Sequence, residues 1–148
     1  MEKKLVKELM TKKFVKVFED EPIYELVGKI IKDRQAKLGC IVDRDNRLKG
    51  IIIPKELLEM VEIREFGHIK YPFFRGPEAL RILASKYARD IMCPPVFVVP
   101  EDTIDKAIHI MLDRGFYEVP VVDKNGKMLG IINYFAILSQ ATRYLENS

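Results

Sequence analysis

The stretch "EVPVVDKNGKMLGII", residues 118–132, contains two apolar runs separated by turn-forming residues. A similar stretch, "LGCIVDRDNRLKGII", occupies residues 38–52, and an offset of 80 residues aligns the two with five identities in 15 positions. Strand-forming residues flank Asn125-Gly126, which favours the positive φ angles of a tight turn, and this pattern predicts a β-hairpin. The chain therefore carries the same hairpin twice.

The duplication extends upstream of each hairpin. "KELMTKKFVKV" from residue 7 matches "RDIMCPPVFVV" from residue 89 at an offset of 82, and the 80-residue offset also pairs Ile30 with Ile110. Apolar residues spaced by three and four predict helices starting at Ile23 and Ile104. Short strands are predicted from Phe14 and Val96, and each hairpin is followed by a predicted helix, near Pro54 and near Asn133.

Each repeat therefore reads β-α-β-β-α, and its strands are apolar on nearly every residue, which indicates that both faces are buried. One repeat is too small to cover its own sheet, so we expect an α/β (α+β) fold of two β-α-β-β-α repeats packed sheet to sheet. The expected boundaries are 6–60 for the first repeat, 61–87 for an aromatic connector and linking helix, 88–140 for the second repeat, and 141–148 for the C-terminal tail of the last helix.

Composition excludes several classes of protein. With 48% hydrophobic and 32% charged residues, the chain is typical of a globular protein, and its apolar runs are shorter than the roughly 20 residues of a membrane span. The N-terminus lacks the apolar stretch of a secretory signal, so we expect a cytoplasmic protein without membrane contact. Its lysines are interrupted by Glu2 and Glu8, which favours a solvated helix face over a nucleic-acid-binding arm.

No catalytic or metal-binding pattern is present in the sequence. The two cysteines and two histidines, Cys40, His68, Cys93 and His109, are far apart and lack the close pairs of structural zinc sites. Neither a nucleophile elbow nor a phosphate-binding glycine loop occurs. We therefore expect no enzymatic activity, no metal and two free thiols.

The motifs "ELM" and "DIM", "CIVD" and "PVVD", and the repeated "GII" resemble, in their order, spacing and doubling, a tandem pair of cystathionine-β-synthase-type (CBS) domains, or Bateman module. The resemblance implies a stand-alone regulatory module whose two repeats are related by pseudo-two-fold symmetry. Clefts between the repeats of such pairs commonly bind AMP, ADP, ATP or S-adenosylmethionine. It also implies a homodimer that passes ligand occupancy to an effector protein, and no required cofactor.

The family's ribose-binding signature, Gly-apolar-apolar-Thr/Ser-x-x-Asp, follows each hairpin in altered form. In the first copy Ile53 replaces the hydroxyl residue and Glu56 stands where Asp is expected; in the second copy Asn133 and Ala136 hold these positions. Glu56 is either a ribose ligand or an acid favoured at a helix start, and Lys55 beside it binds phosphate or solvent. Asn133 is a ligand contact, a helix cap, or both.

The resemblance assigns further ligand-binding candidates to the strand entries, the first strands and the start of the last helix: Phe14, Val15, Lys37, Leu38, Gly39, Val96, Phe97, Tyr117, Glu118, Val119, Pro120 and Phe135. Core packing is the alternative for each. The connector carries Phe66, Tyr71, Phe73 and Phe74 and is a plug, a lid, a dimer patch or ordinary packing. After it, apolar spacing predicts a helix from Pro77 to Ile91. If the clefts are degenerate, the alternative function is a structural or protein-interaction module.

Overall fold

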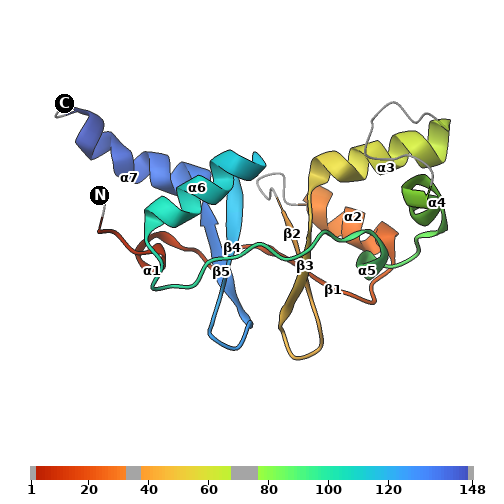
Figure 1. Cartoon of the computed structure of the whole chain (residues 1–148), viewed down its shortest axis with the longest axis horizontal. Helices are drawn as coiled ribbons and strands as arrows, with labels where there is room; N and C mark the ends of the chain where they lie inside the picture. The colour runs from red at the N-terminus through yellow and green to blue at the C-terminus, as the bar shows by residue number, and fades with distance from the viewer. Residues whose placement is uncertain (1–2, 33–37, 68–76, 147–148) are drawn as a thin grey trace. The chain divides into compact units, whose positions relative to one another are not determined.

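A computed structural model gives the structure of residues 3–32, 38–67 and 77–146, with the side chains of residues 77–79 not described. Its helices are α1 (Val6–Leu9), α2 (Ile23–Lys32), α3 (Pro54–Phe66), α4 (Pro77–Ala84), α5 (Ala88–Ile91), α6 (Ile104–Arg114) and α7 (Tyr134–Glu146) (Figure 1). Its strands are β1 (Val15–Phe18), β2 (Gly39–Val42), β3 (Leu48–Ile52), β4 (Glu118–Val122) and β5 (Met128–Asn133). The fold is α+β, as the sequence predicts.

The chain forms two compact units. The first-repeat unit comprises Val15–Asp43 and Lys49–Pro94, and the second-repeat unit comprises Met1–Phe14, Arg44–Leu48 and Pro95–Ser148. Each unit therefore contains most of one repeat, although the turn of the first hairpin, Arg44–Leu48, falls in the second-repeat unit. Each unit has its own cluster of buried apolar side chains.

The first-repeat unit contains a three-stranded sheet in the order β1-β2-β3. β1 runs parallel to β2, in a register that pairs Val15 with Gly39 and Phe18 with Val42. All four residues of β2 are buried, which confirms that this strand is covered on both faces. α2 packs on β1 through an apolar face, and α3 follows β3 directly.

In the second-repeat unit β4 pairs antiparallel with β5, and all five residues of β4 are buried. The strand predicted from Val96 is reduced to a single parallel bridge between Val98 and Val121, so that prediction was wrong. The N–H of Val98 donates to the carbonyl of Pro120, and the N–H of Val122 donates to the carbonyl of Val98. The ladder stops there because Pro120 and Pro100 have no N–H to donate at the next positions.

The central helices agree with the predicted apolar stripes, with one change of register. The buried residues of α2 are Ile23, Leu26 and Ile30, and those of α6 are Ile104, Ala107 and Met111. The buried residues of the two helices therefore align at an offset of 81 residues. Ile30 corresponds to Met111 in burial, whereas the sequence alignment paired it with Ile110.

Two local predictions need correction. Gly126 has a positive φ of 81° but Asn125 does not; the turn is held instead by Asp123, whose Oδ1 accepts hydrogen bonds from the N–H groups of Asn125 and Lys127. The linking helix is not continuous, because α4 ends at Ala84. Asp90 Oδ2 accepts the N–H groups of Lys86 and Tyr87 and so starts a new helix, α5.

The segments that lead into the repeats pair with the opposite hairpins. Thr11 exchanges two backbone hydrogen bonds with Ile131, each 2.9 Å long, and Val6 on α1 is completely buried in the second-repeat core. In the first-repeat unit Cys93 makes the same exchange with Ile51. Figure 1 shows α1, in red, beside the blue elements of the second repeat.

The pairing of these leading segments with the hairpins explains the glycine of the repeated "GII" motif. A Cβ added to Gly130 would overlap the carbonyl oxygen of Thr11, and one added to Gly50 would lie 2.7 Å from the carbonyl oxygen of Cys93. Both glycines have negative φ, so close backbone approach rather than turn geometry requires them.

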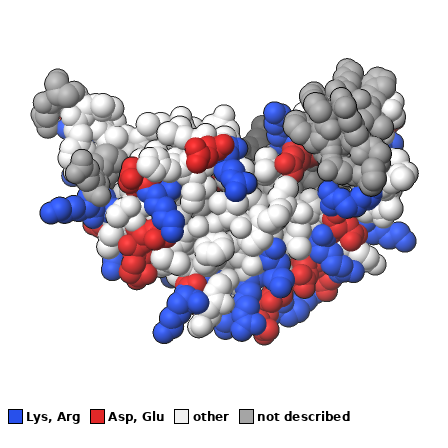
Figure 2. Space-filling view, viewed as in Figure 1, with Lys and Arg blue, Asp and Glu red and all other residues white. Residues whose placement is uncertain are grey.

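The surface carries mixed charge. On the face shown in Figure 2, lysines and arginines are interspersed with acidic residues over the described parts of the chain. Among the helices of those parts, none has both the length and the apolar character needed to cross a membrane.

Candidate ligand-binding site

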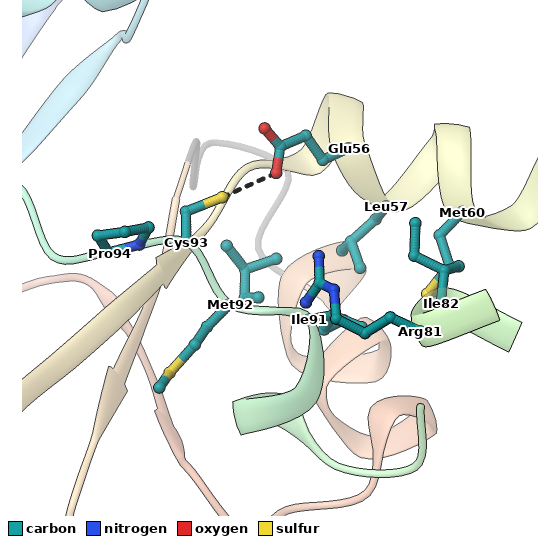
Figure 3. Close-up of a pocket in the computed structure, with 10 residues that line it drawn as sticks. Glu56, Leu57, Met60, Arg81, Ile82, Ile91, Met92, Cys93 and Pro94 are labelled. Atoms are coloured by element: carbon teal, nitrogen blue, oxygen red, sulfur yellow. Dashed lines mark hydrogen bonds between the residues drawn. The ribbon is translucent and has the colours of Figure 1, made fainter. Parts of the chain in front are cut away.

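A cavity of about 170 Å³ opens in the first-repeat unit beside the first turn of α3 (Figure 3). Its apolar wall consists mainly of Ile52, Leu57, Met60, Ile82, Ile91 and Met92. Three polar side chains also line it: Glu56 from α3, Arg81 from α4, and Cys93 from the segment after α5 that pairs with β3, here called the crossing segment. A mostly apolar cavity with a few convergent polar groups is typical of small-ligand sites.

Glu56 lies where a helix start favours a negative charge. Ile53 is the N-cap of α3 and offers no side-chain hydrogen bond, and Pro54 is the first helical residue. A glutamate at this third position often bonds back to the N-cap backbone, but the Glu56 carboxylate instead accepts a hydrogen bond from Cys93 Sγ, with 2.9 Å between Oε2 and sulfur. Its charge is therefore turned toward the cavity.

Cys93 is a neutral donor in this arrangement. Burial, the hydrogen bond to Glu56 and the negative charge of Glu56 together raise the pKa of its thiol to about 12, against the opposing charge of Arg81. A thiol with this pKa stays protonated at neutral pH, so Sγ carries the hydrogen that Glu56 accepts.

Arg81 places a positive charge on the same cavity. Its Nη1 donates to the backbone carbonyl of Asp90 at 2.6 Å, which ties α4 to α5 and fixes the guanidinium group. An arginine has five N–H donors, so most of this group is left for an anion. The cavity thus combines a carboxylate acceptor, a guanidinium donor and an apolar wall.

Glu59, one turn further along α3, is a second acid on this helix and is buried. Burial raises its pKa, as do the charges of Glu56 and Glu62, while Lys55 opposes the shift. Negative charge thus gathers along the first turns of α3.

The predicted site residues of the first repeat are not all brought together. Glu56 lines the cavity, but Lys55 is exposed and Leu38 is buried. Val15 and Gly39 are paired in the sheet. Ile53 caps α3 and Phe14 belongs to the second-repeat unit. Lys37 lies outside the described residues, as do His68 and the connector aromatics Tyr71, Phe73 and Phe74.

Four predicted residues of the second repeat do lie together. Glu118 pairs with Asn133 across the β4–β5 ladder, and Tyr134 donates its N–H to the carbonyl of Tyr117. The Tyr134 ring lies 5.6 Å from those of both Tyr117 and Phe135. Asn133 Oδ1 accepts the N–H of Phe135, as the capping alternative predicts. The remaining candidates are dispersed: Val119 and Pro120 are buried in β4, Val96 is half-buried and Phe97 is exposed.

Sequence reasoning missed Arg81, Cys93 and Tyr134 as site residues. Arg81 comes from the connector helix, which has no counterpart in the other repeat, so no motif marks it. For Cys93 a signal exists: the glycine at position 50 requires a backbone close by, and the offset of 82 assigns that place to residue 93.

Within the described ranges no group of three or more histidine, cysteine or acidic side chains is placed to hold a metal ion.

Two β-strand hairpins, each framed by helices and each crossed by the other repeat's leading segment, define a paired-repeat module. The CBS domain family model matches residues 6–63 and 88–142, and the chain belongs to this family. An uncharacterised protein of Methanopyrus kandleri is 46% identical over 59 residues, a match that covers 39% of this chain and 30% of that protein.

Solved structures share the fold over nearly the whole chain. A CBS domain-containing protein from Thermotoga maritima is 31% identical, with a TM-score of 0.79 and coverage of 95% of this chain and 96% of that one. CBSX2 in complex with AMP is 20% identical (TM-score 0.72, coverage 95% and 98%). The CBS domain pair of protein MJ0100, in complex with 5′-methylthioadenosine and S-adenosyl-L-methionine, is also 20% identical (TM-score 0.70, coverage 95% and 97%).

Proposed function

We propose that this protein is a regulatory CBS pair that binds an adenosine-containing ligand, such as AMP, ADP, ATP or an S-adenosyl compound, at the cavity beside Glu56. The observation that carries the proposal is the position of Glu56. It occupies the Asp place of the ribose signature and lines a cavity that also contains Arg81. A carboxylate accepts hydrogen bonds from sugar hydroxyls, and a guanidinium group binds phosphate or carboxylate.

The comparisons support the class of ligand. CBSX2 has been solved with AMP, and the MJ0100 pair with 5′-methylthioadenosine and S-adenosyl-L-methionine, and both share this fold. Such a ligand regulates by shifting a population of conformations, by no more than its differential affinity for them. We propose that an effector protein reads this shift and that the chain itself catalyses no reaction.

Glu56→Ala is expected to abolish ligand-induced stabilisation. For the wild-type chain, a ligand at one hundred times its Kd stabilises the folded state by about 2.7 kcal/mol, which thermal shift detects. The panel is AMP, ADP, ATP, S-adenosylmethionine and NAD at millimolar concentration, and calorimetry gives the affinities. Glu65→Ala removes an exposed carboxylate from the same helix and is the matched control.

The proposed function is rejected if no member of the panel changes the melting temperature of the wild-type chain. If Glu56→Ala and Glu65→Ala respond alike, the ligand binds somewhere other than this cavity.

The second repeat favours a different role. Ala136 stands at the ribose position, Asn133 caps α7, and the rings of Tyr117, Tyr134 and Phe135 pack together. These residues support a structural or protein-interaction surface there rather than a second ribose site. We therefore propose one adenosyl ligand per chain, and calorimetric stoichiometry measures this number.

We also propose that the chain forms a homodimer through exposed apolar residues of α2, α3, α6 and α7. Leu58 on α3 and Leu138 on α7 are 71% and 47% exposed, and they occupy equivalent positions in the two repeats. Ile31 and Leu112, at matching positions of α2 and α6, are 67% and 70% exposed. A self-associating surface would cover such side chains.

Leu58→Lys combined with Leu138→Lys is expected to convert the dimer into a monomer, because buried lysines in an apolar interface are unpaired charges. Sedimentation velocity measures the mass. Leu80→Lys changes an equally exposed leucine on α4, outside the proposed interface, and is expected to leave the dimer intact. A monomeric wild-type chain would contradict the proposal.

A further inference from the structure

We propose that Cys93 is a positioning residue for the ligand-binding carboxylate: its thiol holds one oxygen of Glu56, so that the other oxygen faces the ligand in a defined direction. This inference rests on the proposed function and names a residue of the same cavity that the ribose signature does not contain. Figure 3 shows the dashed bond from Cys93 to one oxygen of Glu56, with the other oxygen turned away from the sulfur.

Both residues are fixed to one strand. Cys93 exchanges backbone hydrogen bonds of 3.0 and 2.8 Å with Ile51 in β3, and the chain continues from β3 through Ile53 into α3, where Glu56 lies. The backbone therefore holds the two residues close enough for the thiol and the carboxylate to meet. Their 2.9 Å contact joins two partly buried side chains.

The contact has a specific use at a glutamate. Glutamate has one more methylene than the aspartate of the signature, hence one more rotatable bond and a larger entropy loss when a ligand fixes it. A hydrogen bond from a neighbouring donor limits this rotation before the ligand arrives, and such preorganisation raises affinity. The thiol therefore offsets the longer side chain.

The second-repeat unit provides an internal comparison. The offsets of 80 and 82 relate Glu56 to Ala136 and Cys93 to Thr11. Where the carboxylate is missing, the hydroxyl of Thr11 accepts a hydrogen bond from the N–H of Lys13, at 3.2 Å, within its own segment. The polar side chain at this position therefore bonds to a carboxylate only in the first repeat, where Glu56 supplies one.

The protonation state of the thiol agrees with this role. The charged side chains that line the cavity with Cys93 are Glu56 from α3 and Arg81 from α4. Burial and Glu56 raise the pKa of the thiol, and Arg81 opposes them, with a net result of about 12. The thiol is thus kept as a donor.

Alkylation of Cys93 by iodoacetamide at pH 8.5 tests the contact without any ligand. Glu56→Gln keeps the shape of the side chain but removes its charge, so the thiolate fraction of Cys93 rises by about tenfold for each unit by which its pKa falls. We expect alkylation at least about tenfold faster than in the wild-type chain, followed by mass spectrometry of the Cys93 peptide. Glu65→Gln is the charge-matched control, and buried Cys40 is the internal reference.

Ligand affinity tests the positioning itself, by calorimetry with whichever of AMP, ATP and S-adenosylmethionine binds the wild-type chain most tightly. Cys93→Ala is expected to weaken binding by about tenfold through loss of a hydrogen bond to a charged group, and Cys93→Ser, which keeps a donor, to restore most of it.

The outcomes separate the two proposals. Equal alkylation rates in the wild-type chain and Glu56→Gln, or unchanged affinity in Cys93→Ala, would overturn the role of Cys93 and leave the proposed function standing. Failure of every member of the panel of AMP, ADP, ATP, S-adenosylmethionine and NAD to bind the wild-type chain would overturn the proposed function whatever the alkylation rates.

Discussion

Gly130→Ala is expected to destabilise the protein by about 3 kcal/mol or more, because the new methyl group has no space. The added Cβ would overlap the carbonyl oxygen of Thr11. That oxygen accepts the N–H of Ile131, and Thr11 donates its own N–H in return, so the segment has to give up backbone hydrogen bonds in order to move. Urea unfolding measures the loss.

Alanine substitutions of two other glycines provide a scale for this change in stability. Gly50→Ala is expected to cost less, since its nearest contact is the flexible side chain of Met92, although the carbonyl of Cys93 is also close. Gly28→Ala, on α2 with nothing within 4 Å of the added Cβ, is expected to stabilise the fold by about 1 kcal/mol. If Gly130→Ala is as stable as Gly28→Ala, the N-terminal segment does not lie over the second hairpin.

Val6→Asp is expected to cause the second large loss of stability. The elements in which the loss appears test the fold as much as its size does. Val6 is 0% exposed in the core of the second-repeat unit, so a carboxylate there is desolvated without a partner. We expect a loss of about 3 kcal/mol or more in the free energy of unfolding. Hydrogen exchange is expected to accelerate in α6 and α7, although the substitution lies at the other end of the sequence.

Lys7→Asp places the same side chain on the next residue, which is exposed, and is expected to change stability little. Faster exchange in α2 rather than in α6 after Val6→Asp would contradict the assignment of the N-terminal segment to the second-repeat unit.

Most of the fold was predictable because the signals are local. The spacing of Ile23, Leu26 and Ile30 specifies a helix whatever surrounds it, and the uninterrupted apolar run of β4 specifies a strand covered on both sides. The errors arose where a distant partner decides. A strand from Val96 depends on N–H groups across the ladder, and Pro120 has none.

The candidate site divides in the same way. Glu56 was predictable because it follows a repeated motif at a fixed spacing. Arg81 and Cys93 reach the cavity from another helix and from a crossing segment, 25 and 37 residues further along the chain. These separations from Glu56 match neither the repeat offset nor the periodicity of a helix or a strand. The three residues come together only in the tertiary structure, so the sequence does not predict them as one site.

The exchange of leading segments has a consequence for how this chain can be divided. A cut between the repeats would give two fragments. Each fragment would have a hairpin glycine without the backbone that packs on it, and each would keep the leading segment that pairs with the hairpin of the other fragment. Neither fragment would be self-sufficient, but the two would complement each other.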